Sequence, residues 1–307
     1  THGVSTPVSD HVERVSVASD GTEGNSTSSG PLISMGGRYV AFTSYSTNLI
    51  SGDTSGNADV FWHDRDTGET TRVSVDSDGN QANSGNFGPS LSEDGQSVAF
   101  YSSATNLVIG DDNLYADIFV KDLDTGETEL VSVDSNGNSG DGSSYRPSIS
   151  KEGRYVAFES QASNLVSGDG NLATDIFVHD RETGVTSRVS VNSTGDQADV
   201  GSIGAVISGN GRYVVFHSAA SNLVPGDTNG DWDIFVHDRE TGETTRVSMD
   251  SDGNEGTGSI LGSYDPSISA DGRYVAFYSD ATDLVDGDSN EAGDIFVHDR
   301  VAGVTTR

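Results

Sequence analysis

The chain has 307 residues, no cysteine, 33% hydrophobic residues and a formal net charge of −32. The lack of cysteine excludes disulfides and thiolate metal sites, and the acidic surface excludes attraction to nucleic acid phosphates or anionic membranes. No apolar run approaches the roughly 20 residues of a membrane-spanning helix, so we expect neither nucleic acid binding nor membrane insertion.

A long internal repeat organises the chain. The run Gly-Arg-Tyr-Val-Ala-Phe, or a close variant, begins at Gly37, Gly95, Gly153, Gly211 and Gly272. The successive spacings are 58, 58, 58 and 61 residues, and the last is longer because of three extra residues near 259–261. A period of this length indicates that each repeat is one supersecondary unit.

Each repeat reads as four short strands, seen for example in residues 266–269, 273–279, 233–238 and 245–249. Two tight glycine turns alternate with two long loops, one acidic and one rich in glycine and serine. We therefore expect both long loops on one edge of the molecule, where binding is to be sought. Strand two is apolar at nearly every position, which suits a sheet packed between two neighbours.

These features predict an all-β fold, a five-bladed β-propeller of four-stranded antiparallel blades. Residues 1–11 are expected to be an N-terminal extension and residues 12–307 a single propeller. The predicted repeats are about 30–87, 88–145, 146–203, 204–264, and 265–307 plus 12–17. Residues 12–17 match a fourth strand, so we expect the N-terminal strand to complete the last blade and close the ring. A slice of a longer repeat array is the alternative.

The strand-one serine, the Asp-Gly turn, the apolar strand two and the Asp-x-Thr-Gly turn resemble the TolB-like (WD40-like) β-propeller repeat family. The resemblance runs from Val12 onward and implies protein–protein interaction, or a regulatory propeller beside a hydrolase domain. The 58-residue period and the inserted Gly-Asp-x-Asn loop depart from the pattern of that family.

The inserted acidic loop follows the pattern Gly-Asp-x-Asn-x-x-x-Asp-(Ile/Val)-Phe in the five repeats, with Ser55 in place of the asparagine in the first. Its oxygens at relative positions 1, 3 and 7 resemble the first part of a calcium-binding loop. The predicted Ca²⁺ ligands are Asp53, Ser55, Asp59, Asp111, Asn113, Asp117, Asp169, Asn171, Asp175, Asp227, Asn229, Asp233, Asp288, Asn290 and Asp294. Alternatively, the Asp and Asn side chains cap turns through hydrogen bonds to the backbone.

Two further positions recur. Strand three carries His63, His179, His237 and His298, with Lys121 in the second repeat, and we expect these side chains to pair with nearby acids. Strand four carries Arg72, Arg188 and Arg246, with Leu130 in the second repeat, and ion pairing is the expected role of the arginines.

Near-identical blades argue against one catalytic centre, because catalysis needs distinct residues in distinct roles. The five strand-one segments contain no Asp or Glu, so the carboxylate pair of a glycoside hydrolase is not expected along the channel. The predicted function is a non-catalytic, extracellular or cell-surface calcium-binding propeller. Its partner is a protein or a cell-surface polysaccharide, or it self-assembles. A lectin-like module, in which Tyr115 and Trp232 stack on sugars, and a glycoside-active enzyme are the alternatives.

Overall fold

The computed structural model describes residues 12–257, 262–290 and 292–307. Within these ranges the chain forms strands and loops without a helix, and hence no helix long and apolar enough to cross a membrane. Twenty strands make five four-stranded antiparallel sheets, which confirms the predicted five blades. The predicted extension at residues 1–11 and the insertion near residues 259–261 lie outside the described residues.

The strands follow the order of the chain. The first blade is β1 (Ser28–Ile33), β2 (Tyr39–Ser44), β3 (Asp59–Asp64) and β4 (Glu69–Arg72), and the second is β5 (Asn86–Leu91), β6 (Ser97–Ser102), β7 (Asp117–Asp122) and β8 (Thr128–Leu130). The third is β9 (Ser144–Ile149), β10 (Tyr155–Ser160), β11 (Asp175–Asp180) and β12 (Val185–Arg188). The fourth is β13 (Ser202–Ile207), β14 (Tyr213–Ser218), β15 (Asp233–Asp238) and β16 (Glu243–Arg246), and the fifth is β17 (Ser263–Ile268), β18 (Tyr274–Ser279), β19 (Asp294–Asp299) and β20 (Val304–Thr306).

The hydrophobic core lies between the blades. One cluster joins Ile118 and Val120 of the second blade to Val156 and Phe158 of the third, all without exposed surface. A strand packed on both faces has no place for a polar alternate. This explains why strands two and three read as continuous apolar runs.

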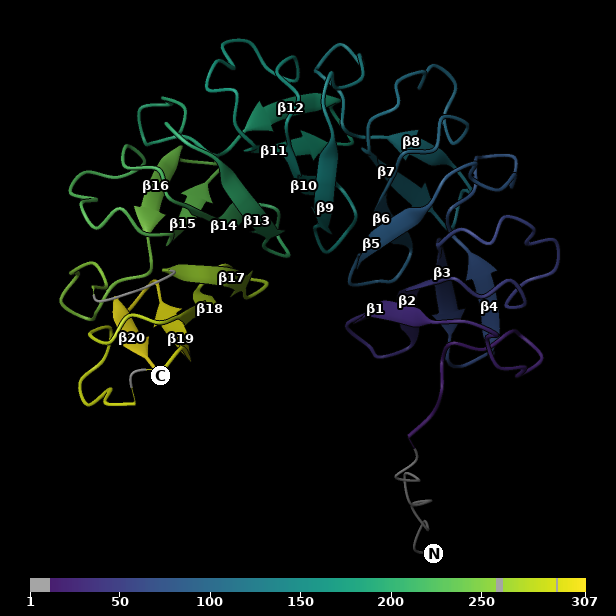
Figure 1. The fold of residues 1–307 in the computed structure, drawn as a ribbon, viewed down its shortest axis with the longest axis horizontal. Helices are drawn as coiled ribbons and strands as arrows, with labels where there is room; N and C mark the ends of the chain where they lie inside the picture. Colours follow the sequence, from purple (N-terminus) through teal and green to yellow (C-terminus); the bar gives the residue numbers. More distant parts are fainter. Residues whose placement is uncertain (1–11, 258–261, 291) are drawn as a thin grey trace, which may run out of the picture.

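Figure 1 shows the blades side by side along an arc, with β1, β5, β9, β13 and β17 on its concave side. Each of these strands contacts the next one along the arc, and among the described residues no comparable contact joins β17 to β1. The arc is open between the first and fifth blades (Figure 1). The expected closure of the ring is therefore not what the structure has.

The N-terminal segment does not complete the last blade, because β20 supplies its fourth strand from the chain's own C-terminal residues. Residues 17–19 instead lie beside the first blade, where Thr70 donates hydrogen bonds to Val17 O and Ser19 Oγ. Thr128 of the second blade bonds Val75 O and Ser77 Oγ in the same way. Residues 12–17 therefore resemble a strand-four segment because they take the place that such a segment takes before the next blade along the chain.

The fifth blade presents an apolar face at its end of the arc. In β19, Ile295 is 61% exposed and Val297 is 37% exposed. The equivalent residues of the three preceding blades, Ile118, Val120, Ile176, Val178, Ile234 and Val236, are completely buried by the next blade. At the other end, Phe42 and Phe61 of the first blade are buried in a cluster that includes Val15 and Ile50.

Candidate functional site

In the first, third and fourth blades the acidic loop and the long loop after strand four meet at one edge, as expected. In the first blade the amide Nε2 of Gln81 donates to Asp53 Oδ1 at 2.9 Å and to Asp59 Oδ2 at 3.0 Å. In the third blade Gln197 Nε2 bridges Asp169 and Asp175 at 2.8 and 2.7 Å. The opening and closing aspartates of a loop, which are six positions apart in the sequence, therefore form one acid pair.

An arginine from strand four lies at the acid pair in four blades. Arg246 Nη1 is 3.5 Å from Asp227, 3.4 Å from Asp233 and 2.8 Å from Glu255. The same contacts to the opening and closing aspartates are 3.5 and 3.5 Å for Arg72, 3.4 and 3.9 Å for Arg188, and 2.6 and 3.2 Å for Arg307. The expected ion pairing of the strand-four arginines is thus confirmed, and apart from Glu255 its partners are the predicted calcium ligands.

The closing aspartates lie at the buried start of strand three. Asp59, Asp117, Asp175 and Asp233 are at most 2% exposed. Burial raises the pKa of each of these four carboxyl groups above its ordinary value. A serine after strand four holds the carboxylate, and Ser74, for example, donates to Asp59 Oδ1 at 2.7 Å. One oxygen of the closing aspartate's carboxylate is therefore held by the serine of the sheet, and the other oxygen faces the loop.

The asparagine two residues after the opening aspartate has a turn-capping role in the structure. Asn113 Oδ1 accepts a hydrogen bond from the backbone N–H of Tyr115 at 2.7 Å, and its amide donates to Asp117 Oδ2 at 2.8 Å. Asn229 and Asn290 make the same pair of contacts. This is the alternative that the sequence left open for these residues.

The second blade departs from the others at its acid pair. Leu130 stands in place of the arginine and packs into the apolar core, while Ser139 stands in place of Gln81 and Gln197. Asp111 is 5% exposed, and its Oδ1 has no hydrogen-bond partner. Burial, with the charge of Asp117 beside it, raises the pKa of Asp111 to about 6.

The recurring histidines pair with threonines rather than with the expected acids. His63, His179, His237 and His298 each place Nδ1 2.9 Å from a threonine Oγ1 of strand four. Lys121 of the second blade donates to Thr128 Oγ1 at 3.1 Å from the same position. These side chains are buried structural links between strands three and four.

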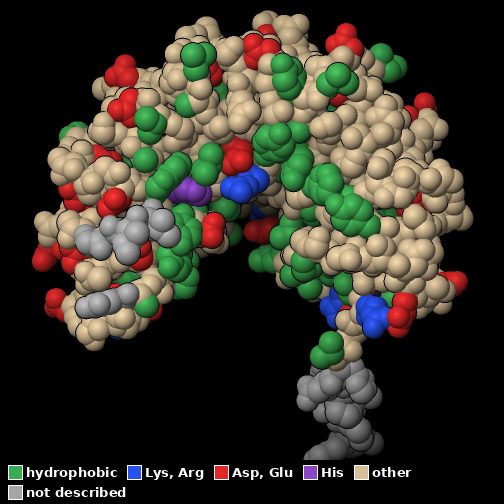
Figure 2. All heavy atoms as spheres, in the orientation of Figure 1, with side chains coloured by type: hydrophobic (Ala, Val, Ile, Leu, Met, Phe, Trp, Pro, Cys, Tyr) green, Lys and Arg blue, Asp and Glu red, His purple; other side chains and the backbone are tan. Residues whose placement is uncertain are grey.

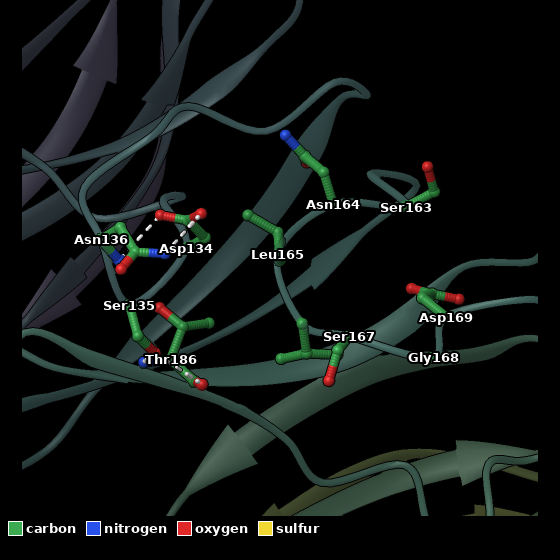
Figure 3. A pocket seen from close by; sticks show the side chains of 11 residues that line it. Asp134, Ser135, Asn136, Ser163, Asn164, Leu165, Ser167, Gly168, Asp169 and Thr186 are labelled. Carbon is green, nitrogen blue, oxygen red and sulfur yellow. Dashed lines mark hydrogen bonds between the residues drawn. The ribbon is translucent and has the colours of Figure 1, made fainter.

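Polar hollows recur between neighbouring blades on the acidic edge. Residues 134–136 and 163–169, with Thr186, line one of about 610 Å³, in which carboxylate, amide and hydroxyl groups surround Leu165 (Figure 3). Residues 192–194 and 221–226, which are 58 positions further along the chain, line a second of about 350 Å³. Tyr115 is 47% exposed, whereas Trp232 packs edge-on against His217 with ring centroids 5.3 Å apart.

The concave side carries a charged cluster that sequence reasoning missed. Figure 2 shows basic, acidic and histidine side chains among apolar ones there. Arg146 Nε is 3.8 Å from Glu159 Oε1, and Arg146 and Asp265 line one hollow with residues of all five strand-one segments. Nearby His217 is 7% exposed, and its Nδ1 has no hydrogen-bond partner.

A signal for this cluster is present in the sequence. Arg146 and Asp265 have φ of 49° and 51° at a position where three other repeats have glycine. A side chain in this left-handed region costs about 1–2 kcal/mol, which is a reason to look for function there. Glu159 and His217 occupy a strand-two position that differs in nearly every repeat. The positions at which the otherwise similar repeats differ in sequence therefore include those that form the charged cluster on the concave surface.

Solved structures with the same fold are found at low sequence identity. TolB from Acinetobacter baumannii is 16% identical with a TM-score of 0.51, and the match covers 91% of this chain and 53% of that one. A putative TolB from Agrobacterium tumefaciens is 16% identical with a TM-score of 0.54, over 92% of this chain and 80% of that one.

The β-propeller domain of the Trilobed protease from Pyrococcus furiosus, described as having an open velcro topology, is 13% identical with a TM-score of 0.52. That match covers 91% of this chain and 70% of the other. No protein-family model matches the sequence, and no curated protein matches it. The chain spans about half the length of the first TolB structure. The strand order, the blades and these likenesses together show that the chain has the TolB-like β-propeller fold.

Proposed function

We propose that this chain is a non-catalytic, extracellular calcium-binding β-propeller that acts as an assembly module. The observation that carries the proposal is the apolar end face of the fifth blade, where Ile295 and Val297 are exposed. Full burial of such a side chain contributes roughly 1.5–3 kcal/mol. A partner that covers this face as one blade covers another would therefore gain a substantial part of its binding energy from these two residues.

The acidic edge supports the calcium part of the proposal. Its loops bring two carboxylates together in every blade, and oxygen ligands are what Ca²⁺ binds in proteins. A net charge of −32 also favours an environment rich in cations. The expected result is that EDTA lowers the melting temperature and that added Ca²⁺ restores it. An unchanged melt at low ionic strength would contradict calcium binding.

The threonine-bonded histidines and the repeated blades support a non-catalytic role. A protein or a cell-surface polysaccharide is the partner class we propose besides a second copy of the chain.

Analytical ultracentrifugation of the chain over a wide concentration range tests the assembly proposal. We expect self-association of the wild type and its loss in Ile295→Asp, because a buried unpaired carboxylate opposes an apolar interface. Val301→Asp is the matched control, since Val301 is 77% exposed in the same blade but lies in the β19–β20 turn. A wild-type chain that stays monomeric throughout would refute self-assembly.

Glycan binding is a second candidate, favoured by the equivalent hollows between blades. Their hydroxyl, amide and carboxylate groups are the groups that hydrogen-bond sugars, and the same hollow occurs at positions 58 residues apart. A glycan array tests this, with Ser163→Ala and Asn164→Ala as variants in the hollow of Figure 3. Binding that these substitutions leave unchanged would place the sugar site elsewhere.

A further inference from the structure

The acid pairs of the acidic edge differ in how their charge is balanced. In the first, third, fourth and fifth blades an arginine Nη1 lies within 3.9 Å of both aspartates. A guanidinium in this place supplies the positive charge that a cation would otherwise bring. A metal ion there would have to displace the arginine and leave it without its acidic partners.

The second blade has an acid pair without this arginine. Leu130 cannot donate a hydrogen bond or carry charge, and it is packed against the apolar residues of the first two blades. Ser139 has a side chain too short to take the bridging place of Gln81 or Gln197. The one lysine of this blade, Lys121, lies further along β7 and bonds Gly126 O and Thr128 Oγ1.

The consequence is visible at Asp111. It is 95% buried, since its exposed fraction is 5%, and its Oδ1 has no hydrogen-bond partner. The backbone N–H of Asn113 does bond this carboxylate, but a buried carboxylate that has one oxygen without a donor and no counter-charge is still costly. Asp117 beside it is fully buried, with Oδ1 bonded to Ser132 at 2.6 Å and Oδ2 to Asn113 at 2.8 Å. The unpartnered oxygen and the missing arginine are independent observations that both point to an absent cation.

We propose that the second blade holds one Ca²⁺ ion between Asp111 and Asp117, and that arginines replace this ion in the other four blades. This inference rests on the calcium part of the proposed function and states which loop carries it. Asn113 would turn its amide so that its oxygen, rather than its nitrogen, faces the ion. Backbone oxygens and water would complete the about six to eight oxygen ligands of Ca²⁺.

Isothermal titration of chelator-stripped full-length protein with CaCl₂ tests the proposal, with MgCl₂ as the comparison ion. We expect one Ca²⁺ site per chain and a much weaker response to Mg²⁺, which requires stricter octahedral geometry. Asp111→Asn should weaken Ca²⁺ at least about tenfold, since even outer-shell substitutions cost about 10–100-fold in metal affinity. Asp112→Asn removes an exposed charge from the same loop and should weaken Ca²⁺ much less than Asp111→Asn does.

Exchanging the residues that distinguish the acid pair of the second blade from those of the first and third tests whether they decide where Ca²⁺ binds. Leu130→Arg with Ser139→Gln reproduces the arginine and glutamine of the first and third blades, and it should abolish the site. Arg72→Leu with Gln81→Ser should create a second site in the first blade. Circular dichroism of each variant in EDTA confirms that it folds, and Asp111→Asn stands as the isosteric variant should the double substitutions unfold the blade.

The outcomes separate the two proposals. One site that is lost in Asp111→Asn and in the Leu130→Arg, Ser139→Gln variant supports the assignment. About five sites, or an affinity that Asp111→Asn leaves unchanged, would overturn the assignment and leave calcium binding in place. No Ca²⁺ binding at millimolar concentration would overturn both, while the self-association experiment would still test the assembly module.

Discussion

Substitution of Arg246 by methionine would remove the cation from the most acidic of the loop clusters. Arg246 is 9% exposed and contacts Asp227, Asp233 and Glu255 within 3.5 Å. Removing one partner of a buried ion pair costs about 3–5 kcal/mol, because the remaining charge is left uncompensated. We expect Arg246→Met to lose about this much stability in EDTA at pH 7.

The loss should shrink at lower pH. Burial and the neighbouring Asp233 already raise the pKa of Asp227 to about 6 in the presence of the arginine. Without it the folded state favours protonated carboxyl groups still more, so the variant gains stability as the pH falls from 7 to 5. Urea unfolding followed by circular dichroism and tryptophan fluorescence measures both values.

Arg14→Met is the matched control for this experiment. Arg14 occupies the equivalent position before the first blade, and its contact to Glu23 is exposed, with side-chain exposures of 56% and 72%. An exposed ion pair contributes about 0–1 kcal/mol. If Arg246→Met loses no more stability than Arg14→Met, the cluster is not held together by its arginine and the reasoning fails.

Three further predictions concern single residues. In EDTA, Asp111→Asn should stabilise the protein by up to about 2 kcal/mol at pH 7, because burial raises the pKa of Asp111 to about 6. The gain in stability should vanish near pH 4 in thermal melts. A gain that does not depend on pH would contradict this prediction. Hydrogen bonds from Arg212 lower the pKa of Asp238 to about 2. This ion pair therefore stabilises the fold above about pH 4, and the melting temperature should fall as the pH drops from about 4 to 2. Asp238→Asn should make the melting temperature less dependent on pH in this range. Gly211→Ala should lower the free energy of unfolding in urea by about 2–4 kcal/mol, because its Cβ would lie 2.1 Å from the Tyr155 ring at φ +72°. Gly79→Ala is the control, with φ +85° and no described atom within 4 Å, and it should cost only about 1–2 kcal/mol. Equal costs would argue against the contact between blades.

Much of the fold was predictable because it is local. The strand expected at residues 273–279 corresponds to β18 (Tyr274–Ser279), and the glycine of the tight turn before it, Gly272, has φ +77°. Turn glycines and short apolar runs act within a few residues, so a single repeat is enough to specify a blade. The position of the acid pairs followed in the same way from the pattern of one loop.

The opening of the arc was not predictable from the repeat. It depends on the angle between one blade and the next, which accumulates over the four interfaces between the five blades and has no signature in any one repeat. The match of residues 12–17 to strand four was real, yet in the structure this segment precedes the first blade. Sequence similarity between repeats identifies a structural position but not the blade that it joins.

The sequence by itself determined the repeat, its four strands and the loop in which opposite ends carry aspartates. Only the tertiary structure decided that Arg246 reaches the acid pair, that Leu130 leaves Asp111 without a cationic partner, and that Arg146, His217 and Asp265 from three blades lie on one concave surface. The physical reason is that the balance of buried charge depends on contacts between strands and blades, whereas turns and strand periods depend on neighbours along the chain.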